Sequence, residues 1–238
     1  MRVALHEFQS PSTCGYLPDR LQRLEYIIVQ SISSAEYQIL MEHGWRHFGH
    51  MLFRPACEGC VACRTVRIDV QAFSPNRNQR RVARLNAGVM EPAFVPPECT
   101  PEVLRLYDAW HDHQSENKGW PAHFSGDGSQ FEQSFVRQPF QVEQWEYRLD
   151  GQLVGTGYVD ILPNALSAIY FFYDSNIKDR SPGIWNVLRI IEEARTREIP
   201  HVYLGYLVEG CPGMAYKGTF HPAEVRELGK EWQPLPTL

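Results

Sequence analysis

Three cysteines with two-residue spacers are the sharpest chemical feature of the sequence. Cys57, Cys60 and Cys63 form a Cys-x2-Cys-x2-Cys run. Such spacing lets thiolates converge on one ion while nearby backbone N–H groups point at the sulfurs. A tetrahedral site or a cluster needs a fourth ligand, and Cys14 is the best remote candidate. The four thiols therefore predict a zinc or iron–sulfur site, and the alternative is that they are reduced, structural cysteines.

Four arginines form the next feature. Arg77, Arg80, Arg81 and Arg84 recur at the spacing i, i+3, i+4 and i+7, with no acidic residue between positions 76 and 84. On a helix this spacing places all four side chains on one face. Because like charges repel there unless an anion is present, the stripe favours contact with phosphate groups over a merely solvated face.

The segment Arg180-Ser181-Pro182-Gly183 is expected to begin a helix directly after a strand. The free N–H groups at a helix N-terminus suit a phosphate or a reacting carbonyl. Acetyl-CoA enzymes of the GCN5-related type usually carry an Arg/Gln-x-x-Gly-x-Gly/Ala loop at such a place. Trp185 stands where the last small residue belongs, so the sequence disfavours ordinary coenzyme A binding.

Tyrosines and a lysine cluster near the C-terminus. Tyr203-Leu-Gly-Tyr206 and the loop ending at Tyr216-Lys217 could line an acyl acceptor site, or could be only an edge strand and a turn. No Ser/His/Asp order stands out, and the histidines show no ligand pairing with the cysteines. We expect most of them on the surface; those considered are His43, His47, His50, His111 and His113.

Periodicity and capping patterns predict the elements that position these residues. The expected helices cover residues 34–43, 74–88, a segment from 100 and a segment from 181; the expected strands cover 65–70, 142–149, 153–161, 166–174 and 201–206, with Asp150-Gly151 as a hairpin turn. The order is helices, three strands, helix, strand. It resembles the α/β (α+β) fold of the GCN5-related acyltransferases.

Composition and charge set the outer limits. The chain has 238 residues, 43% of them hydrophobic, and a formal net charge of −5, which fits a globular protein of one to two domains. Residues 1–84 carry 11 Lys/Arg and 7 Asp/Glu, whereas residues 85–238 carry 12 and 21. This asymmetry points to an anionic partner for the first part. We expect a cysteine- and arginine-rich module at 1–88, a proline-rich linker at 89–100 and a second module at 101–238.

The N-terminal residues and the apolar runs indicate the compartment. MRVALHEFQS has only a three-residue apolar run, and the longest apolar stretch is residues 168–173. Both are too short for a signal peptide or a membrane span. We therefore expect a cytosolic protein with reduced thiols and no membrane partner.

Taken together, the motifs resemble the arginyl-tRNA–protein transferase family, in its short prokaryotic branch. The resemblance runs over nearly the whole chain. Its motifs are Cys14-Gly-Tyr-Leu-Pro-Asp-Arg20, Gly44-Trp-Arg46-His-Phe-Gly49, Phe53-Arg54-Pro55, the cysteine run, Ser74-Pro-Asn-Arg77-Asn-Gln-Arg80-Arg81, Asp160-Ile-Leu-Pro163, Leu166-Ser-Ala-Ile-Tyr170-Phe-Phe-Tyr173-Asp174, Arg180-Ser181-x-Gly183, Tyr203-Leu-Gly205-Tyr206 and Met214-Ala-Tyr216-Lys217.

The resemblance implies transfer of an amino acid from an aminoacyl-tRNA to the α-amine of a protein that begins with Asp or Glu, which marks the product for degradation. The short branch implies leucyl-tRNA as donor and no cofactor for the transfer itself. An arginyl donor is the first alternative. A coenzyme A-dependent N-acetyltransferase and a non-catalytic zinc-binding RNA adaptor are the others, and the oligomeric state is left open.

This reaction assigns a role to each candidate residue. Ester aminolysis needs a neutral amine and an oxyanion stabiliser, and an acidic acceptor side chain needs a fixed cation. The catalytic candidates are Asp160 as orienter or base, Tyr206 and Lys217. The substrate-binding candidates are Arg46, Arg54, Tyr170, Tyr173 and Tyr203, with Lys217 as a further cation; the tRNA-binding candidates are Arg77, Arg80, Arg81, Arg180, Ser181 and Gly183.

Two positions depart from the family's pattern. Leu17 stands where the eukaryotic members have a second cysteine, so the four-thiol set would have to be built from Cys14 and the cysteine run. His47-Phe48 stands where the family often has Arg-Ser, which removes a second arginine beside Arg46.

Overall fold

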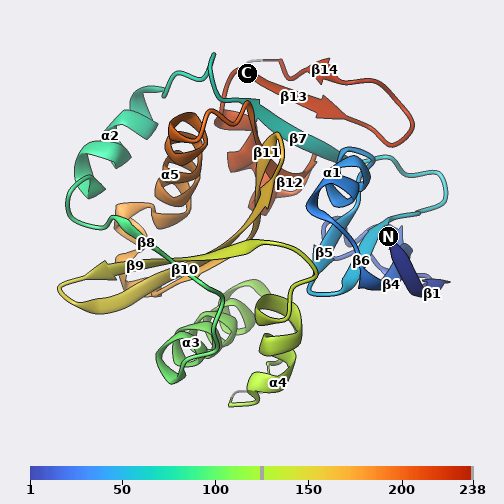
Figure 1. Cartoon of the computed structure of the whole chain (residues 1–238), viewed down its shortest axis with the longest axis horizontal. Helices are drawn as coiled ribbons and strands as arrows, with labels where there is room; N and C mark the ends of the chain where they lie inside the picture. Colours follow the sequence, from blue (N-terminus) through green and yellow to red (C-terminus); the bar gives the residue numbers. More distant parts are fainter. Residues whose placement is uncertain (124–125, 237–238) are drawn as a thin grey trace.

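A large mixed sheet forms the centre of the computed structural model, which describes residues 1–123 and 126–236. Its strand order is β14-β13-β7-β12-β11-β10-β9-β8 (Figure 1). The strands are β7 (Cys63–Asp69), β8 (Pro92–Val95), β9 (Val142–Leu149), β10 (Gln152–Leu162), β11 (Ala165–Tyr173), β12 (His201–Val208), β13 (Ala223–Arg226) and β14 (Gln233–Pro234). All pairings are antiparallel except that of β11 with β12.

A second sheet is built from the N-terminal residues and has the order β1-β4-β6-β5. Its strands are β1 (Arg2–Phe8), β4 (Leu24–Ser31), β5 (Arg46–Phe48) and β6 (Met51–Pro55), and β2 (Ser12–Thr13) pairs separately with β3 (Leu21–Gln22). Helix α1 (Ser34–Glu42) joins β4 to β5. Its residues Tyr37 and Met41 pack with Leu162 and Ala165, which attaches the small sheet to the end of the β10–β11 hairpin.

The remaining helices cover the two faces of the large sheet. They are α2 (Arg77–Asn86), α3 (Pro101–Lys118), α4 (Gly128–Phe131) and α5 (Pro182–Thr196), with a π-helical turn η1 (Glu132–Val136) and two 3₁₀ segments, η2 (Ser175–Arg180) and η3 (Pro212–Thr219). Tyr170 and Phe172 of β11 pack in the cluster with α3, whereas Phe171 packs against the cluster that contains α5. Helices α3 and α5 therefore lie on opposite faces, as Figure 1 shows.

Local sequence explains where the main helices begin. Ser33 and Glu36 form the predicted capping box of α1, and Asn76 with Gln79 forms a second one at α2. The Thr100 hydroxyl caps α3, and Pro182 occupies the first position of α5. The helices and strands predicted from periodicity are confirmed, with ends shifted by a few residues, whereas the small sheet was not foreseen.

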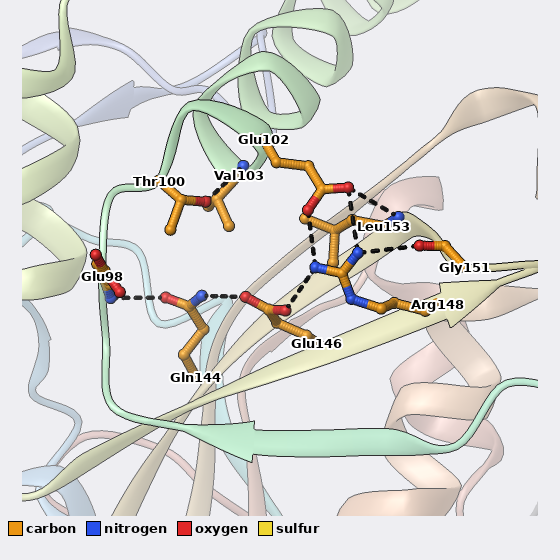
Figure 2. A network of polar contacts seen from close by, with 9 residues as sticks. All are labelled: Glu98, Thr100, Glu102, Val103, Gln144, Glu146, Arg148, Gly151 and Leu153. Atoms are coloured by element: carbon orange, nitrogen blue, oxygen red, sulfur yellow. Dashed lines mark hydrogen bonds and ion pairs between the residues drawn. The ribbon is translucent and has the colours of Figure 1, made fainter.

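The N-terminus of α3 is fixed to the β9–β10 hairpin by the polar network of Figure 2. The Arg148 guanidinium donates to both carboxylate oxygens of Glu102, at 3.2 and 2.7 Å, and to Glu146 at 3.2 Å. Glu102 also accepts from the backbone N–H of Leu153 at 3.3 Å. Because a planar guanidinium meets a carboxylate in two bonds, this network holds the start of α3 against the β9–β10 hairpin.

The centre of the sheet opens where its two parallel strands separate. β11 and β12 pair only from Ala165–Ser167 to His201–Tyr203. Beyond that point β11 stays paired with β10 up to Tyr173, and β12 stays paired with β7 up to Val208. The ends of the two strands therefore diverge, and the segments that follow them, η2–α5 and η3, lie beside the opening.

The segment that the sequence suggests as a linker is not a boundary between sheets. β7 precedes residues 89–100 but lies between β12 and β13, and α2 packs on α5. The residues before and after the segment therefore share one core. Within the described ranges, no helix combines the length and the apolar character needed to cross a membrane.

Candidate active site

Two buried cations lie on either side of Gly205 in β12. The Lys217 ammonium donates to the Tyr206 carbonyl at 2.9 Å, and the Arg46 guanidinium donates to the Gly205 carbonyl at 3.1 Å and to the Thr65 hydroxyl at 3.2 Å. Neither cation forms an ion pair with a carboxylate in the part of the chain that the structure describes. Two uncompensated buried charges leave this place suited to an anion or a developing negative charge.

Gly205 is required where it stands. Its φ of +77° lies in the left-handed region, and a Cβ there would sit 3.6 Å from the Lys217 Nζ and 3.9 Å from the Arg46 Nε. The Arg46 Nε is itself buried without a hydrogen-bond partner among the described residues. A group bound at Gly205 would therefore meet N–H donors from both cations.

Lys217 is a buried lysine with a lowered pKa. Burial, together with the nearby Arg46 charge, lowers the pKa of Lys217 from 10.5 to about 7, while Cys211 acts in the opposite direction. A lysine of ordinary pKa is almost wholly protonated at neutral pH, but one near 7 can accept a proton. This is the behaviour expected of a base that keeps an attacking amine neutral.

Tyr206 holds Arg46 in place. Its hydroxyl donates to the Gly44 carbonyl at 2.6 Å, and the Arg46 guanidinium lies over its ring at 4.8 Å from the centroid. Burial raises the pKa of the Tyr206 hydroxyl well above its usual range, so the group stays neutral. Tyr206 therefore links the loop before β5 to the strand that carries Gly205.

Asp160 is paired with a histidine that the sequence suggested would be on the surface. Its carboxylate lies 2.8 Å from the His47 Nε2, and both side chains are fully buried. The His47 Nδ1 faces the Gly49 carbonyl at 3.1 Å. Because each ring nitrogen faces an oxygen atom, the two contacts fix the orientation of the His47 ring beside Asp160. His47 is thus an exception to the expectation that most of these histidines lie on the surface.

The other candidate cation of the N-terminal part is already neutralised. Arg54 donates from Nε to Glu25 at 2.6 Å and lies over the Trp45 ring at 4.8 Å. Glu25 also accepts from His6 at 2.9 Å. Arg54 nevertheless lines a cavity next to Tyr206.

The three candidate tyrosines do not share one pocket. The Tyr170 hydroxyl contacts His111 at 3.1 Å among aromatic residues of α3 and η1. Tyr173 stacks on Trp110 at the end of β11, with ring centroids 4.5 Å apart. Tyr203 is buried against Trp232 on the paired part of β12. The structure thus brings Tyr170 and Tyr173 to the diverging half of β11 and leaves Tyr203 away from it.

The cysteine run lines the same cavity as Arg54 and Tyr206. Burial raises the pKa of the Cys63 thiol to about 12, and the nearby thiols of Cys14, Cys57, Cys60 and Cys211 contribute. The Cys57 sulfur accepts from the Arg23 backbone N–H at 3.4 Å. A raised pKa favours the protonated thiol, and the Cys57 thiol also donates to the Arg23 carbonyl at 3.6 Å, whereas a metal ligand is a thiolate. Among the described residues, no three histidine, cysteine or acidic side chains have the arrangement of a metal site.

Cys211 was not foreseen as a neighbour of this cluster. Val208 pairs with Cys63 across β12 and β7, and the Cys211 N–H bonds back to the Val208 carbonyl at 3.2 Å. The tight turn after β12 therefore returns Cys211 toward Cys63. No local signal reveals this, because the contact depends on the pairing of strands that lie far apart in sequence.

The four arginines of α2 form an exposed stripe, as predicted. Arg77, Arg80, Arg81 and Arg84 are all exposed, and none forms an ion pair with an acidic group in the described ranges. Arg180 extends the stripe, because its guanidinium donates to the Leu85 carbonyl at 3.1 Å. The result is a basic surface of five arginines that continues to the N-terminus of α5.

The start of α5 is open to a ligand. Ser181 has a left-handed backbone and makes no capping bond, and a Cβ added to Gly183 would meet nothing within 4 Å. The Trp185 indole is buried and donates to the Met90 carbonyl at 2.6 Å. The Trp185 ring therefore lies in the core and does not itself obstruct the start of the helix.

The sequence of the chain is similar to those of known proteins. Residues 12–81 match the model described as arginine-tRNA-protein transferase, N terminus, and residues 102–227 match the corresponding C terminus. The chain is similar to proteins named aspartate/glutamate leucyltransferase. One from Halorhodospira halophila is 36% identical (98% of this chain, 95% of that protein), and one from Marinobacter nauticus is 38% identical (95% and 94%).

The fold is also similar to a solved structure. The crystal structure of FemX superimposes with a TM-score of 0.51 at 10% sequence identity, covering 91% of this chain and 84% of that one. At this identity the likeness concerns the fold alone. It confirms the α/β acyltransferase-like architecture expected from the order of the elements.

Proposed function

The chain belongs to the arginine-tRNA-protein transferase family, and from this premise we propose that it moves leucine from leucyl-tRNA to the N-terminal α-amine of proteins that begin with Asp or Glu. The observation that carries the proposal is similarity over nearly the full length to proteins named aspartate/glutamate leucyltransferase. In this family the added residue marks the acceptor for degradation. An aminoacyl-tRNA donor would place the reaction in the cytosol.

A leucyl donor agrees with the site better than an arginyl donor. A guanidinium side chain would need a buried acid, and Asp160, the fully buried carboxylate near the site, is already paired with His47. Tyr170 instead lies among aromatic and aliphatic side chains of α3 and η1. We assign the leucyl side chain to the surface next to Tyr170 and Tyr173.

The transfer is an aminolysis of an ester. The acceptor nitrogen attacks the carbonyl carbon, the C–N bond forms, the ester C–O bond breaks, and the ribose hydroxyl of the tRNA leaves with a proton. Because the ester is already activated, positioning can supply on the order of 7–11 kcal/mol. The diverging ends of β11 and β12 provide the place where ester and amine meet.

Lys217 and Arg46 supply the chemistry that positioning leaves out. Lys217, with a pKa of about 7, takes the proton of the acceptor ammonium and so makes the attacking nitrogen neutral. The unpartnered Nε of Arg46 lies beside Gly205, where it can donate to the oxyanion that forms on the ester carbonyl. Tyr206 and the Asp160–His47 pair keep Arg46 and its strand in position.

The basic surface and the start of α5 bind the tRNA in this proposal. Arg77, Arg80 and Arg81 contact backbone phosphates, and Arg180 continues the path to Ser181 and Gly183. Free N–H groups at the start of a 15-residue helix can receive a further phosphate. Contact limited to one patch suits an enzyme that must release its tRNA after each transfer.

The thiols have a structural part in the proposal. Cys14, Cys57, Cys60 and Cys63 would hold a zinc ion or an iron–sulfur cluster, which would stiffen the loop before β7. The transfer itself uses no group from this site.

One assay tests the proposed function. The purified protein is given radiolabelled leucyl-tRNA or arginyl-tRNA together with peptides that begin with Asp, Glu or Ala. We expect label on the Asp and Glu peptides from leucyl-tRNA and none on the Ala peptide. Labelling from arginyl-tRNA alone, or acceptance of acetyl-CoA in place of both tRNAs, would contradict the proposal.

A further inference from the structure

A small cavity is lined in part by Tyr206, whose carbonyl contacts Lys217. Gly44, Thr65 and Tyr206 line it, together with residues of the cysteine run and of the turn between β13 and β14. Its volume is about 150 Å³, and a cavity of about that size can hold a molecule as large as benzene. It can therefore accept one side chain, but not a nucleotide.

The cavity is a direct neighbour of the two buried cations. Thr65 accepts from Arg46 at 3.2 Å, and Tyr206 carries the Arg46 guanidinium on its ring. The Tyr206 carbonyl in turn accepts from Lys217. Tyr206 therefore contributes to the wall of the cavity and, through its carbonyl, to the contact with Lys217.

The charges along the cavity wall differ in how they are compensated. The Glu42 carboxylate lines the cavity, accepts from the Gln38 amide at 3.2 Å and has no cationic partner among the described residues. Arg54 is paired with Glu25, and Glu227 is paired with Lys230. Arg226 donates only to backbone carbonyls, from Nε to Lys230 at 2.6 Å and from Nη1 to Glu42 at 3.3 Å. In the described ranges its guanidinium pairs with no carboxylate. Arg226 is thus a lining cation that can still receive one.

We propose that this cavity is the subsite for the first side chain of the acceptor protein and that Arg226 binds its carboxylate. The inference rests on the proposed function, since it assumes an acceptor that begins with Asp or Glu. Arg226 would supply the selectivity for an acidic first side chain. Lys217 and Arg46 do not supply it in this proposal, because those two cations face the reacting atoms. Arg226 is a residue that the sequence analysis did not consider.

The test compares peptides that differ only in charge. Transfer of leucine to peptides beginning with Glu and with Gln is measured for the wild type, R226Q and R226K. A charge-assisted bond is worth about 1.5–3 kcal/mol, so R226Q should lose about 10- to 100-fold in kcat/KM toward the Glu peptide. The kcat/KM toward the Gln peptide and the KM for leucyl-tRNA should not change, and R226K should recover part of the kcat/KM toward the Glu peptide.

R67Q is the matched control. Arg67 stacks on the same Trp232 ring as Arg226, at 4.0 Å against 5.9 Å, but pairs with Glu224 and does not line the cavity. It should keep the wild-type preference for Glu over Gln. The assignment would be overturned by an R226Q variant that keeps the preference for Glu over Gln, or by one that loses kcat/KM equally toward both peptides.

A binding measurement without tRNA separates this proposal from the proposed function. It uses the same Glu and Gln peptides, labelled with a fluorophore. If the wild type prefers the Glu peptide in binding and R226Q does not, the subsite stands even if leucyl-tRNA is not the donor. If the wild type binds the Glu and Gln peptides equally, the subsite is refuted whatever the donor is.

Discussion

At the scale of single residues, the site depends on charges that the protein itself does not neutralise. Lys217 and Arg46 lie buried on either side of Gly205 without a carboxylate partner in the described ranges. Such an arrangement destabilises the fold unless a ligand or reacting group uses it. This is why their chemistry and not their packing explains their presence.

The pH dependence of kcat/KM should report Lys217, because that ratio reports the pKa values of the free enzyme. The pKa of its ammonium is lowered from 10.5 to about 7, and only the neutral amine can accept a proton. Activity should therefore rise with pH through about 7 and level off above it, falling about tenfold for each unit below. K217R stays protonated, so it should lose about 10²- to 10⁴-fold in kcat/KM and lose this inflection. A K217R variant with the wild-type profile would remove Lys217 from the mechanism.

Gly49 is a second residue whose role can be tested. It has a φ of +55°, and a Cβ there would overlap the Gln133 carbonyl oxygen. Gly59 has a similar φ of +66° but open space around it. G49A should lower the free energy of unfolding by about 2–4 kcal/mol and G59A by about 1–2 kcal/mol. Equal losses in urea unfolding would show that only backbone strain matters at Gly49.

At the scale of elements, two contacts position the site. The His47–Asp160 pair joins β5 of the small sheet to β10 of the large one, and α2 lies on α5 with its arginines outward. The first contact fixes the strand that carries Arg46, and the second presents the basic surface. Each of the two contacts can be tested separately.

Removing one partner of the buried His47–Asp160 pair should lower the free energy of unfolding. D160A leaves the buried His47 Nε2 without the carboxylate that it faces, which should reduce the free energy of unfolding by about 3–5 kcal/mol. The control is E132A, which breaks the exposed pair with Arg137 and should cost about 0–1 kcal/mol. Urea denaturation measures both, and similar small losses would mean that the buried pair does not hold the two sheets together.

The arginine stripe should set the salt dependence of tRNA binding. Replacing Arg80 and Arg81 by alanine removes two phosphate contacts, so the slope of log Kd against log salt should fall by roughly 1.4–1.8. R137A removes an exposed arginine that is already paired with Glu132 and should leave the slope as it is. A double variant with an unchanged slope would show that this face does not touch the RNA.

At the scale of the whole molecule, the site exists because segments far apart in the chain share one sheet. β7 from the N-terminal part lies between β12 and β13, which brings Thr65 and the cysteine run to the strand of Gly205 and Tyr206. The small sheet then supplies Arg46 from the other side. No single module contains the site.

This arrangement explains what the sequence could and could not predict. Helices and strands of the C-terminal part follow from local periodicity and caps, such as Thr100 at α3. The arginine stripe of α2 follows from spacing alone. The pairing of His47 with Asp160 and the approach of Cys211 to Cys63 depend on strand order, which no local pattern encodes. Arg226 could not be singled out for the same reason, since its surroundings come from three distant segments.

The central claim is that the whole assembly transfers leucine from tRNA to an acidic N-terminus. Its most direct test is a competition in which one Glu-initiated peptide is offered equal amounts of leucyl-tRNA and arginyl-tRNA, with the product identified by mass spectrometry. The account predicts a peptide extended by one leucine at its α-amine. A peptide extended by arginine, or one left unextended while the same protein sample still binds tRNA, would contradict it.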